Sequence, residues 1–157
     1  MTTPEDDVLA AICDRVRSLN VALDEDMRLL GTVPSDLTAF EAMSEHGRVG
    51  ARALLKTVEQ LEDQLTRLFR TILQLRAVDT KDLYVRDVAN RMEAMRIIDS
   101  ADDWMAVVKL RNRLVHDYPL TSEARFAKLA EAGQATDILR VASQRALTYV
   151  DKKDWLA

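Results

Sequence analysis

The feature that most constrains this chain is a run of apolar residues whose spacing alternates between four and three. An α-helix has 3.6 residues per turn, so this spacing places all of them on one stripe of a single helix. A stripe of this kind predicts an antiparallel neighbouring helix or a dimer contact of the coiled-coil type. We therefore expect burial, in the core or at a subunit contact, of Leu54, Val58, Leu61, Leu65, Leu68, Ile72 and Leu75.

The rest of the sequence is also typical of helices, since only 5% of the residues are aromatic and there are four Gly and three Pro. We predict an all-α, up-and-down bundle of about five helices. It forms one domain over residues 1–157, with residues 1–6 disordered. The expected helices are 5–30, 37–76 with weakening at Gly47 and Gly50, 83–98, one capped by Asp99 or Ser100 that ends before Pro119, and 121–152 with an interruption at Gly133.

Composition narrows the possible functions. A net charge of −4 and a pI near 5.2 disfavour a protein that coats nucleic acid in general. The single cysteine, Cys13, excludes an intramolecular disulfide and lies at an apolar helical position, where a core role is expected. No apolar run is long enough for a membrane span, and the acidic N-terminus does not resemble a secretory signal, so we expect a cytoplasmic protein. Two histidines without a cysteine cluster predict no metal site, and we expect no cofactor.

The segment Arg111-Asn112-Arg113-Leu114-Val115-His116-Asp117-Tyr118 carries the residues best suited to chemistry. It is expected to form the last two turns of a helix closed by Pro119. A histidine can accept and donate a proton near neutral pH, and the planar guanidinium of an arginine suits phosphate oxygens. Together they suit metal-free cleavage of RNA, in which the ribose 2′-OH attacks the adjacent phosphate, His116 moves protons and Arg111 stabilises the developing charge.

The spacing within this segment leaves its geometry open. Arg111 and Tyr118 are seven residues apart and fall on one helical stripe, whereas His116 lies roughly 140° around the helix from Arg111. Either the long arginine side chain bridges that angle or a second copy of the helix supplies the missing group. The alternative is that His116 only caps the helix C-terminus, with Arg111 and Arg113 as solvated charges.

The pattern Arg111-x4-His116-x-Tyr118, with Asn112 directly after the arginine, resembles the signature of the HEPN superfamily, and most of all the HepT-like toxins of HEPN–MNT toxin–antitoxin systems. The resemblance implies a metal-independent ribonuclease that works as a homodimer, with two motifs facing one cleft. It also implies that Arg111 and His116 are catalytic and that Asn112 supports them. Tyr118 would then be adenylylated by a partner nucleotidyltransferase antitoxin. The chain departs from typical members in its extended N-terminal section and its acidity.

RNA binding would need a local basic surface, for which two groups of residues are candidates. One is the row Arg48, Arg52 and Lys56, and the other is Arg111 with Arg113. The row has a simpler explanation as a solvated helix face paired with neighbouring glutamates.

Two functions of other classes stay open at this point. One is a non-catalytic helical partner that binds substrate for a nucleotidyltransferase. The other is a structural dimerisation bundle whose motif only caps a helix.

Overall fold

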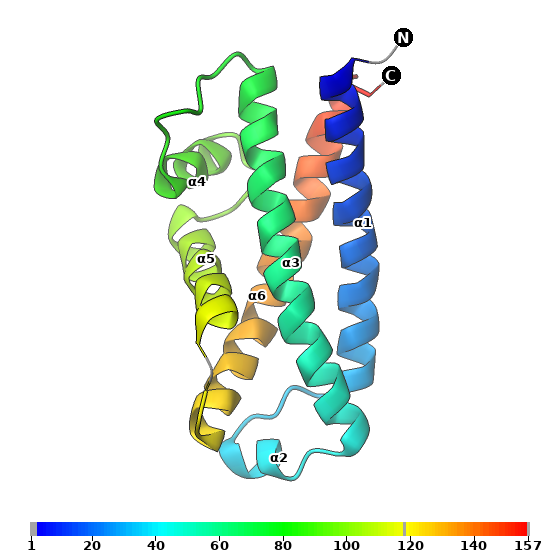
Figure 1. Ribbon diagram of the computed structural model, residues 1–157, viewed down its shortest axis with the longest axis vertical. Helices are drawn as coiled ribbons and strands as arrows, with labels where there is room; N and C mark the ends of the chain where they lie inside the picture. The colour runs from blue at the N-terminus through cyan, green and yellow to red at the C-terminus, as the bar shows by residue number, and fades with distance from the viewer. Residues whose placement is uncertain (1–2, 118, 157) are drawn as a thin grey trace.

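The computed structural model describes residues 3–117 and 119–156, and every element in that part of the chain is a helix. Three long helices run side by side, two shorter ones are stacked along one side of them, and a single-turn helix lies at the end opposite both termini (Figure 1). The predicted all-α bundle is therefore confirmed. The helices are α1 (Pro4–Leu30), α2 (Leu37–Glu41), α3 (Glu45–Leu75), α4 (Val85–Ala94), α5 (Ala101–His116) and α6 (Ser122–Lys152).

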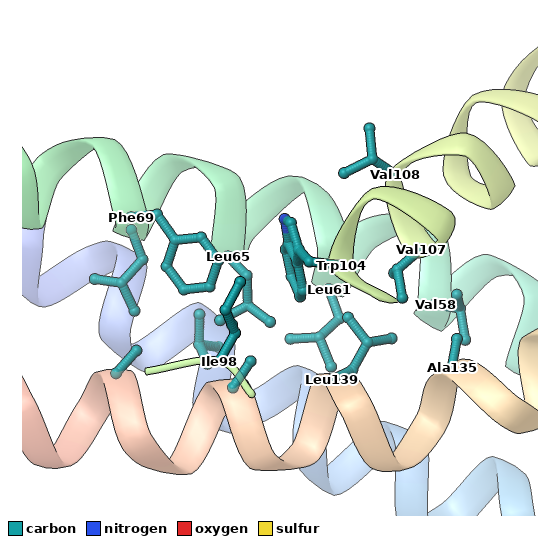
Figure 2. Packing of buried hydrophobic residues seen from close by; sticks show 14 of the residues in the cluster. Val58, Leu61, Leu65, Phe69, Ile98, Trp104, Val107, Val108, Ala135 and Leu139 are labelled. Carbon is teal, nitrogen blue, oxygen red and sulfur yellow. The ribbon is translucent and has the colours of Figure 1, made fainter. Parts of the chain in front are cut away.

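The apolar stripe of α3 forms the centre of the core. Its first six residues are completely buried and its last, Leu75, is half-buried, which confirms the prediction. On the side of α3 that faces α5, the ring of Phe69 packs against the ring of Trp104, with centroids 5.0 Å apart and planes tilted by 54° (Figure 2). Leu139 and Ala135 of α6 line the opposite side of the same cluster (Figure 2). The long helix is thus the spine around which α1, α5 and α6 pack.

Two glycines expected to weaken the helix over 37–76 do not do so. The chain breaks earlier, after α2, and α3 begins where the Ser44 hydroxyl accepts a hydrogen bond from the backbone N–H of Gly47 at 3.0 Å. Gly50 has a different purpose, because a Cβ there would lie 2.4 Å from the backbone nitrogen of Leu30. Gly50 therefore allows α3 to approach the end of α1 more closely than any side chain permits.

The predicted interruption at Gly133 is wrong for a similar reason, since α6 is continuous. A Cβ at Gly133 would lie 3.3 Å from the side chain of Val33, in the connection that precedes α2. The absence of a side chain there lets this connection pack against α6. Sequence alone does not separate a glycine that breaks a helix from one that admits a neighbour.

The N-terminus is more ordered than expected. The Thr3 hydroxyl accepts a hydrogen bond from the backbone N–H of Asp6 at 3.2 Å, and the Asp6 carboxylate accepts one from the backbone N–H of Thr3 at 2.8 Å. This reciprocal capping starts α1 at Pro4, so residues 3–6 differ from the expected disordered segment. Residues 1 and 2 lie outside the described part of the chain.

The helix predicted over 83–98 is shorter than expected. It ends at Ala94, and Arg96 takes a positive φ of 60° in the turn that leads to α5. Of the two caps predicted for α5, Asp99 and Ser100, the structure has Ser100, and Cys13 is buried in the core as predicted. Within the described residues, none of the helices has the length and apolar character needed to cross a bilayer.

Candidate functional site

The candidate site lies on the last two turns of α5, which α3 and α6 hold in place. On its buried face, Trp104, Val107 and Leu110 pack into the core (Figure 2 shows the first two). At its start, the Ser100 hydroxyl accepts a hydrogen bond from the backbone N–H of Asp103 at 3.1 Å. Capping at one end and burial along one face fix the direction in which the polar residues of the last turns project.

Arg111 is directed toward α3, where its guanidinium contacts two carboxylates. Its Nη2 donates a hydrogen bond to Asp63 at 3.2 Å, and its Nε lies 3.5 Å from an oxygen of Glu62. That Nε is buried and has no hydrogen-bond partner within the described chain. The Arg111 side chain is 29% exposed, so part of it still reaches solvent. The structure therefore places Arg111 as a positioned, half-buried cation and not as a freely solvated charge.

Glu62 is the most unusual of these groups, because it is an acidic residue inside the apolar packing of α3. It is only 4% exposed, and desolvation raises the pKa of its carboxyl above the ordinary value. The Thr66 hydroxyl, which donates to Glu62 at 2.6 Å, and the nearby Arg111 act in the opposite direction and favour the charged form. A buried carboxylate of this kind needs a cation beside it. Glu62 and Arg111 therefore depend on each other.

His116 is the last residue of α5 and is exposed to solvent. Asp117 then takes extended backbone dihedrals, with φ −102° and ψ 126°, so α5 ends two residues before the end of the octet that was expected to be helical. Lys128 of α6 donates hydrogen bonds to the carbonyl oxygens of Arg113 at 3.1 Å and of Asp117 at 2.7 Å. The cation that satisfies this helix end is therefore Lys128. The imidazole of His116 is left accessible to a ligand.

The other residues of the motif divide between α3, α6 and solvent. Asn112 is exposed, and its amide oxygen lies 3.4 Å from Nη1 of Arg111, a long and weak contact. Arg113 forms an ion pair with Glu131 of α6. The structure thus brings Asn112 to Arg111, while it ties Arg113 to a different helix.

Within the described part of one chain, Arg111 and His116 do not form a hydrogen-bonded pair. Arg111 is turned toward Glu62 and Asp63, whereas His116 projects into solvent at the helix end. This arrangement agrees with the angular separation predicted from their spacing. Tyr118, the predicted modification site, lies outside the described residues.

The basic row on α3 is split between two environments. Lys56 pairs with Glu59 at 3.1 Å, as the simpler explanation of the row requires. Arg48 and Arg52 instead line a cavity of about 460 Å³ that opens between α2, α3 and α6 and also includes Pro119. Arg48 is partly fixed there, since its guanidinium donates to the carbonyl oxygen of Met43 at 2.8 Å.

Four partners of the motif were missing from the sequence prediction: Glu62, Asp63, Lys128 and Glu131. Glu62 could have been found, because it shares a stripe of α3 with Val58, Leu65 and Phe69, where an acidic residue predicts a buried cation partner. The identity of that partner has no signal in a single sequence, since Arg111 lies 48 residues after Asp63, the neighbour of Glu62 that it also contacts. Across residues 3–117 and 119–156, no three His, Cys, Asp or Glu side chains are grouped so that they could hold a metal ion.

Comparisons with known proteins add nothing to these observations. No protein-family model, no curated protein and no solved structure matches the chain.

Proposed function

We propose that this protein is a metal-independent endoribonuclease whose active site is formed by Arg111 and His116 of α5. The observation that supports it most is that a positioned cation and an exposed imidazole both lie on the last two turns of one helix, whose other face is buried. Arg111 is held from behind by Glu62 and Asp63, and about a third of its side chain reaches solvent. A guanidinium held this way is directed before a phosphate arrives, which is how electrostatic stabilisation of a transition state is achieved.

In the proposed reaction, His116 accepts the proton of a ribose 2′-OH as that oxygen attacks the neighbouring phosphorus. The P–O5′ bond breaks, and a protonated histidine donates a proton to the departing 5′-oxygen. The products are a 2′,3′-cyclic phosphate and a free 5′-OH. One proton leaves the 2′-OH and one is added to the 5′-oxygen, so the reaction consumes no net proton. Arg111 interacts with the phosphate oxygens that gain negative charge in the transition state.

The proposed enzyme is a homodimer with its two α5 ends close to the twofold axis. Arg111 is turned toward α3 and His116 toward solvent, so a single chain does not bring the two groups together. A twofold axis brings a second arginine and a second histidine to the same cleft without any further sequence. It also provides a second imidazole, so that one can accept a proton while the other donates one.

Control by a partner nucleotidyltransferase antitoxin is part of this proposal. Tyr118 follows His116 by two residues, so an adenylate added there would introduce a bulky, negatively charged group beside the site. The added phosphate would repel the RNA backbone, and we propose Arg111 or Arg113 as the cation that binds it.

One observation favours a second function, a non-catalytic partner that binds substrate for a nucleotidyltransferase. Arg111 already has two carboxylates beside it, which neutralise much of its charge within one chain. A cation with such partners stabilises a phosphate less than an unpaired one does. On this second proposal the residues of α5 would contact a nucleotide without cleaving RNA.

A cleavage assay separates these two functions. The purified wild-type protein is incubated with total RNA, with and without EDTA, beside the variant His116→Ala. Cleavage by the wild type that survives EDTA and is lost in His116→Ala supports the ribonuclease. No cleavage by a purified dimer of the wild type would favour the substrate-binding partner instead.

A further inference from the structure

The cavity between α2, α3 and α6 combines an apolar interior with a basic rim, on a protein whose overall charge is negative. Its volume of about 460 Å³ is in the range of cavities that bind small organic ligands. The apolar part is formed by an aromatic ring and aliphatic side chains, Phe40, Met43, Ala51, Leu55 and Leu129. Such walls suit a flat or hydrophobic ligand body and do not by themselves suit a free inorganic ion.

The rim carries four cationic side chains and one carboxylate. The cations are Arg48, Arg52, Arg125 and Lys128, and the carboxylate belongs to Glu41. The net charge around the opening is therefore +3, on a chain whose formal net charge is −4. This local reversal of sign predicts a ligand with a concentrated negative charge, such as a phosphate.

The three arginines are the cations best placed to bind this charge, because Lys128 already donates to two backbone carbonyl oxygens. Arg52 is exposed, and among the described residues Arg125 donates to the hydroxyl of Ser122, in the first turn of its own helix, at 3.2 Å. Guanidinium groups bind phosphate oxygens through two parallel hydrogen bonds and also stack on flat aromatic systems.

The single carboxylate distinguishes between possible ligand bodies. A fatty acid or another plain hydrocarbon chain has no hydrogen-bond donor for Glu41. A nucleobase has N–H groups that a carboxylate accepts, and its flat face packs against an aromatic ring such as that of Phe40. The combination of aromatic wall, arginine rim and one acceptor fits a nucleotide better than an aliphatic acid.

The position of the cavity connects it to the end of α5. Pro119 lies in its wall, three residues after His116. Lys128 also lines the cavity, and the same ammonium group donates to the carbonyl oxygens of Arg113 in α5 and of Asp117 directly after it. A ligand in the cavity is therefore only one side chain away from the helix end that carries His116.

We infer that this cavity is a nucleotide-binding subsite, with the base against Phe40 and Leu55 and the phosphate on Arg52 and Arg125. The inference rests on the proposed function in one respect, namely that the nucleotide would belong to the RNA strand that is cleaved. A free mononucleotide has the same chemistry, and the binding measurements below distinguish these two sources.

The test measures binding by calorimetry in the His116→Ala background, so that RNA is not consumed. The probes are AMP, adenosine, ribose 5-phosphate, decanoate and a short single-stranded oligoadenylate. We expect AMP to bind at least about tenfold more tightly than adenosine or ribose 5-phosphate, because each of these lacks one of the two recognised parts. Decanoate that binds as tightly as AMP would overturn the assignment to a nucleotide.

Charge reversal then locates the site. Arg52→Glu should weaken binding of both AMP and oligoadenylate by about tenfold or more, whereas Arg15→Glu, at an exposed position of α1, should leave it unchanged. Because Arg52 is exposed, its replacement should not alter thermal unfolding, which is measured in parallel. Equal binding by Arg52→Glu and Arg15→Glu would overturn the proposal.

The same variants distinguish an RNA strand from a free mononucleotide as the ligand. They also distinguish failure of the proposed subsite from failure of the proposed ribonuclease. Oligoadenylate that binds more tightly than AMP, with both weakened by Arg52→Glu, assigns the subsite to RNA, and equal affinities assign it to a free nucleotide. Binding that depends on Arg52, in a protein whose wild type cleaves no RNA, would support the subsite and reject the ribonuclease. Cleavage that depends on His116 but not on Arg52, in a protein that binds no nucleotide in the cavity, would support the ribonuclease and reject the subsite.

Discussion

An oxygen of the Glu62 carboxylate lies 3.5 Å from Nε of Arg111, which joins the middle of the longest core stripe to the helix that carries the candidate site. Glu62 is 4% exposed and Arg111 is half-buried, so a substitution of either residue changes the environment of the other. Fold stability and the proposed chemistry therefore depend on the same contact.

Replacing Arg111 should reduce both stability and cleavage. In Arg111→Gln, the Glu62 carboxylate loses its cation inside apolar packing. We expect the free energy of unfolding to fall by about 1–3 kcal/mol. This range is below that of a fully buried ion pair, because Arg111 is partly exposed to solvent. Denaturant unfolding measures this change. The double variant Arg111→Gln with Glu62→Gln should regain much of the stability but no cleavage. If the double variant is no more stable than Arg111→Gln alone, the loss of stability does not come from an unpaired Glu62 carboxylate.

The pH dependence of stability should report on Glu62. Its folded-state pKa is raised above the ordinary value of 4.5, so the folded protein holds this proton more tightly than the unfolded chain does. Stability from this group is complete below 4.5 and is lost as pH rises through the higher folded pKa. Denaturant unfolding from about pH 4.5 to about pH 7.5 should show a fall in the wild type relative to Glu62→Gln. A difference between the two proteins that stays constant across this range would contradict the raised pKa.

Histidine replacement tests the proposed chemistry. His116→Ala should lower the cleavage rate by about 10² to 10⁴, the usual loss for a general acid–base residue, without changing thermal unfolding, because the side chain is exposed. The chain contains one other histidine, His46, which is also exposed and lies in the first turn of α3. His46→Ala is therefore the matched control and should cleave RNA like the wild type. A similar loss in both variants would remove His116 from the mechanism.

Mixing two inactive variants tests the composite site of the proposed dimer. Arg111→Gln and His116→Ala each lack one of the paired groups, but a mixed dimer restores one intact pair across the twofold axis. Partial recovery of cleavage is expected after the two proteins are unfolded together and refolded. Cleavage that never exceeds that of either variant alone, in a sample shown to contain mixed dimers, would argue against a shared site.

Glycine replacement tests the close approach of α1 and α3. In Gly50→Ala, the new Cβ would lie 2.4 Å from the backbone nitrogen of Leu30, and because this is backbone, the two helices must move apart. We expect a loss of about 1–3 kcal/mol in the free energy of unfolding. Gly47→Ala is the control, since its Cβ would meet side-chain atoms of Ser44 and Met43 at 3.3 and 3.4 Å. Equal stability of the two variants would show that the approach at Gly50 is not required.

Features that depend on residues close together in the sequence could be predicted, whereas contacts between residues distant in the sequence could not. Periodicity within a helix is a local property, so the stripe through Leu54 and Ile72 was sufficient to predict burial, and Ser100 was sufficient to predict a cap. The glycines were misinterpreted because their purpose is set by a neighbour distant in sequence, Leu30 for Gly50 and Val33 for Gly133. For the same reason, the sequence indicated Arg111 as a candidate but not the carboxylates that hold it.

The connection over residues 31–44 forms one wall of the basic-rimmed cavity through Phe40, Glu41 and Met43, whereas α3 and α6 form the others. Those two helices also carry the central core, so their sequence is constrained by packing. The connection contributes less to the core, because α2 contains no fully buried residue and its Phe40 only packs against the edge of the core. In the proposed subsite, substitutions in this short segment would alter one side of the wall that meets a base, whereas the arginines proposed to bind the phosphate belong to α3 and α6 and would stay in place. The two halves of a nucleotide would thus be recognised by parts of the chain that differ in how strongly core packing constrains them.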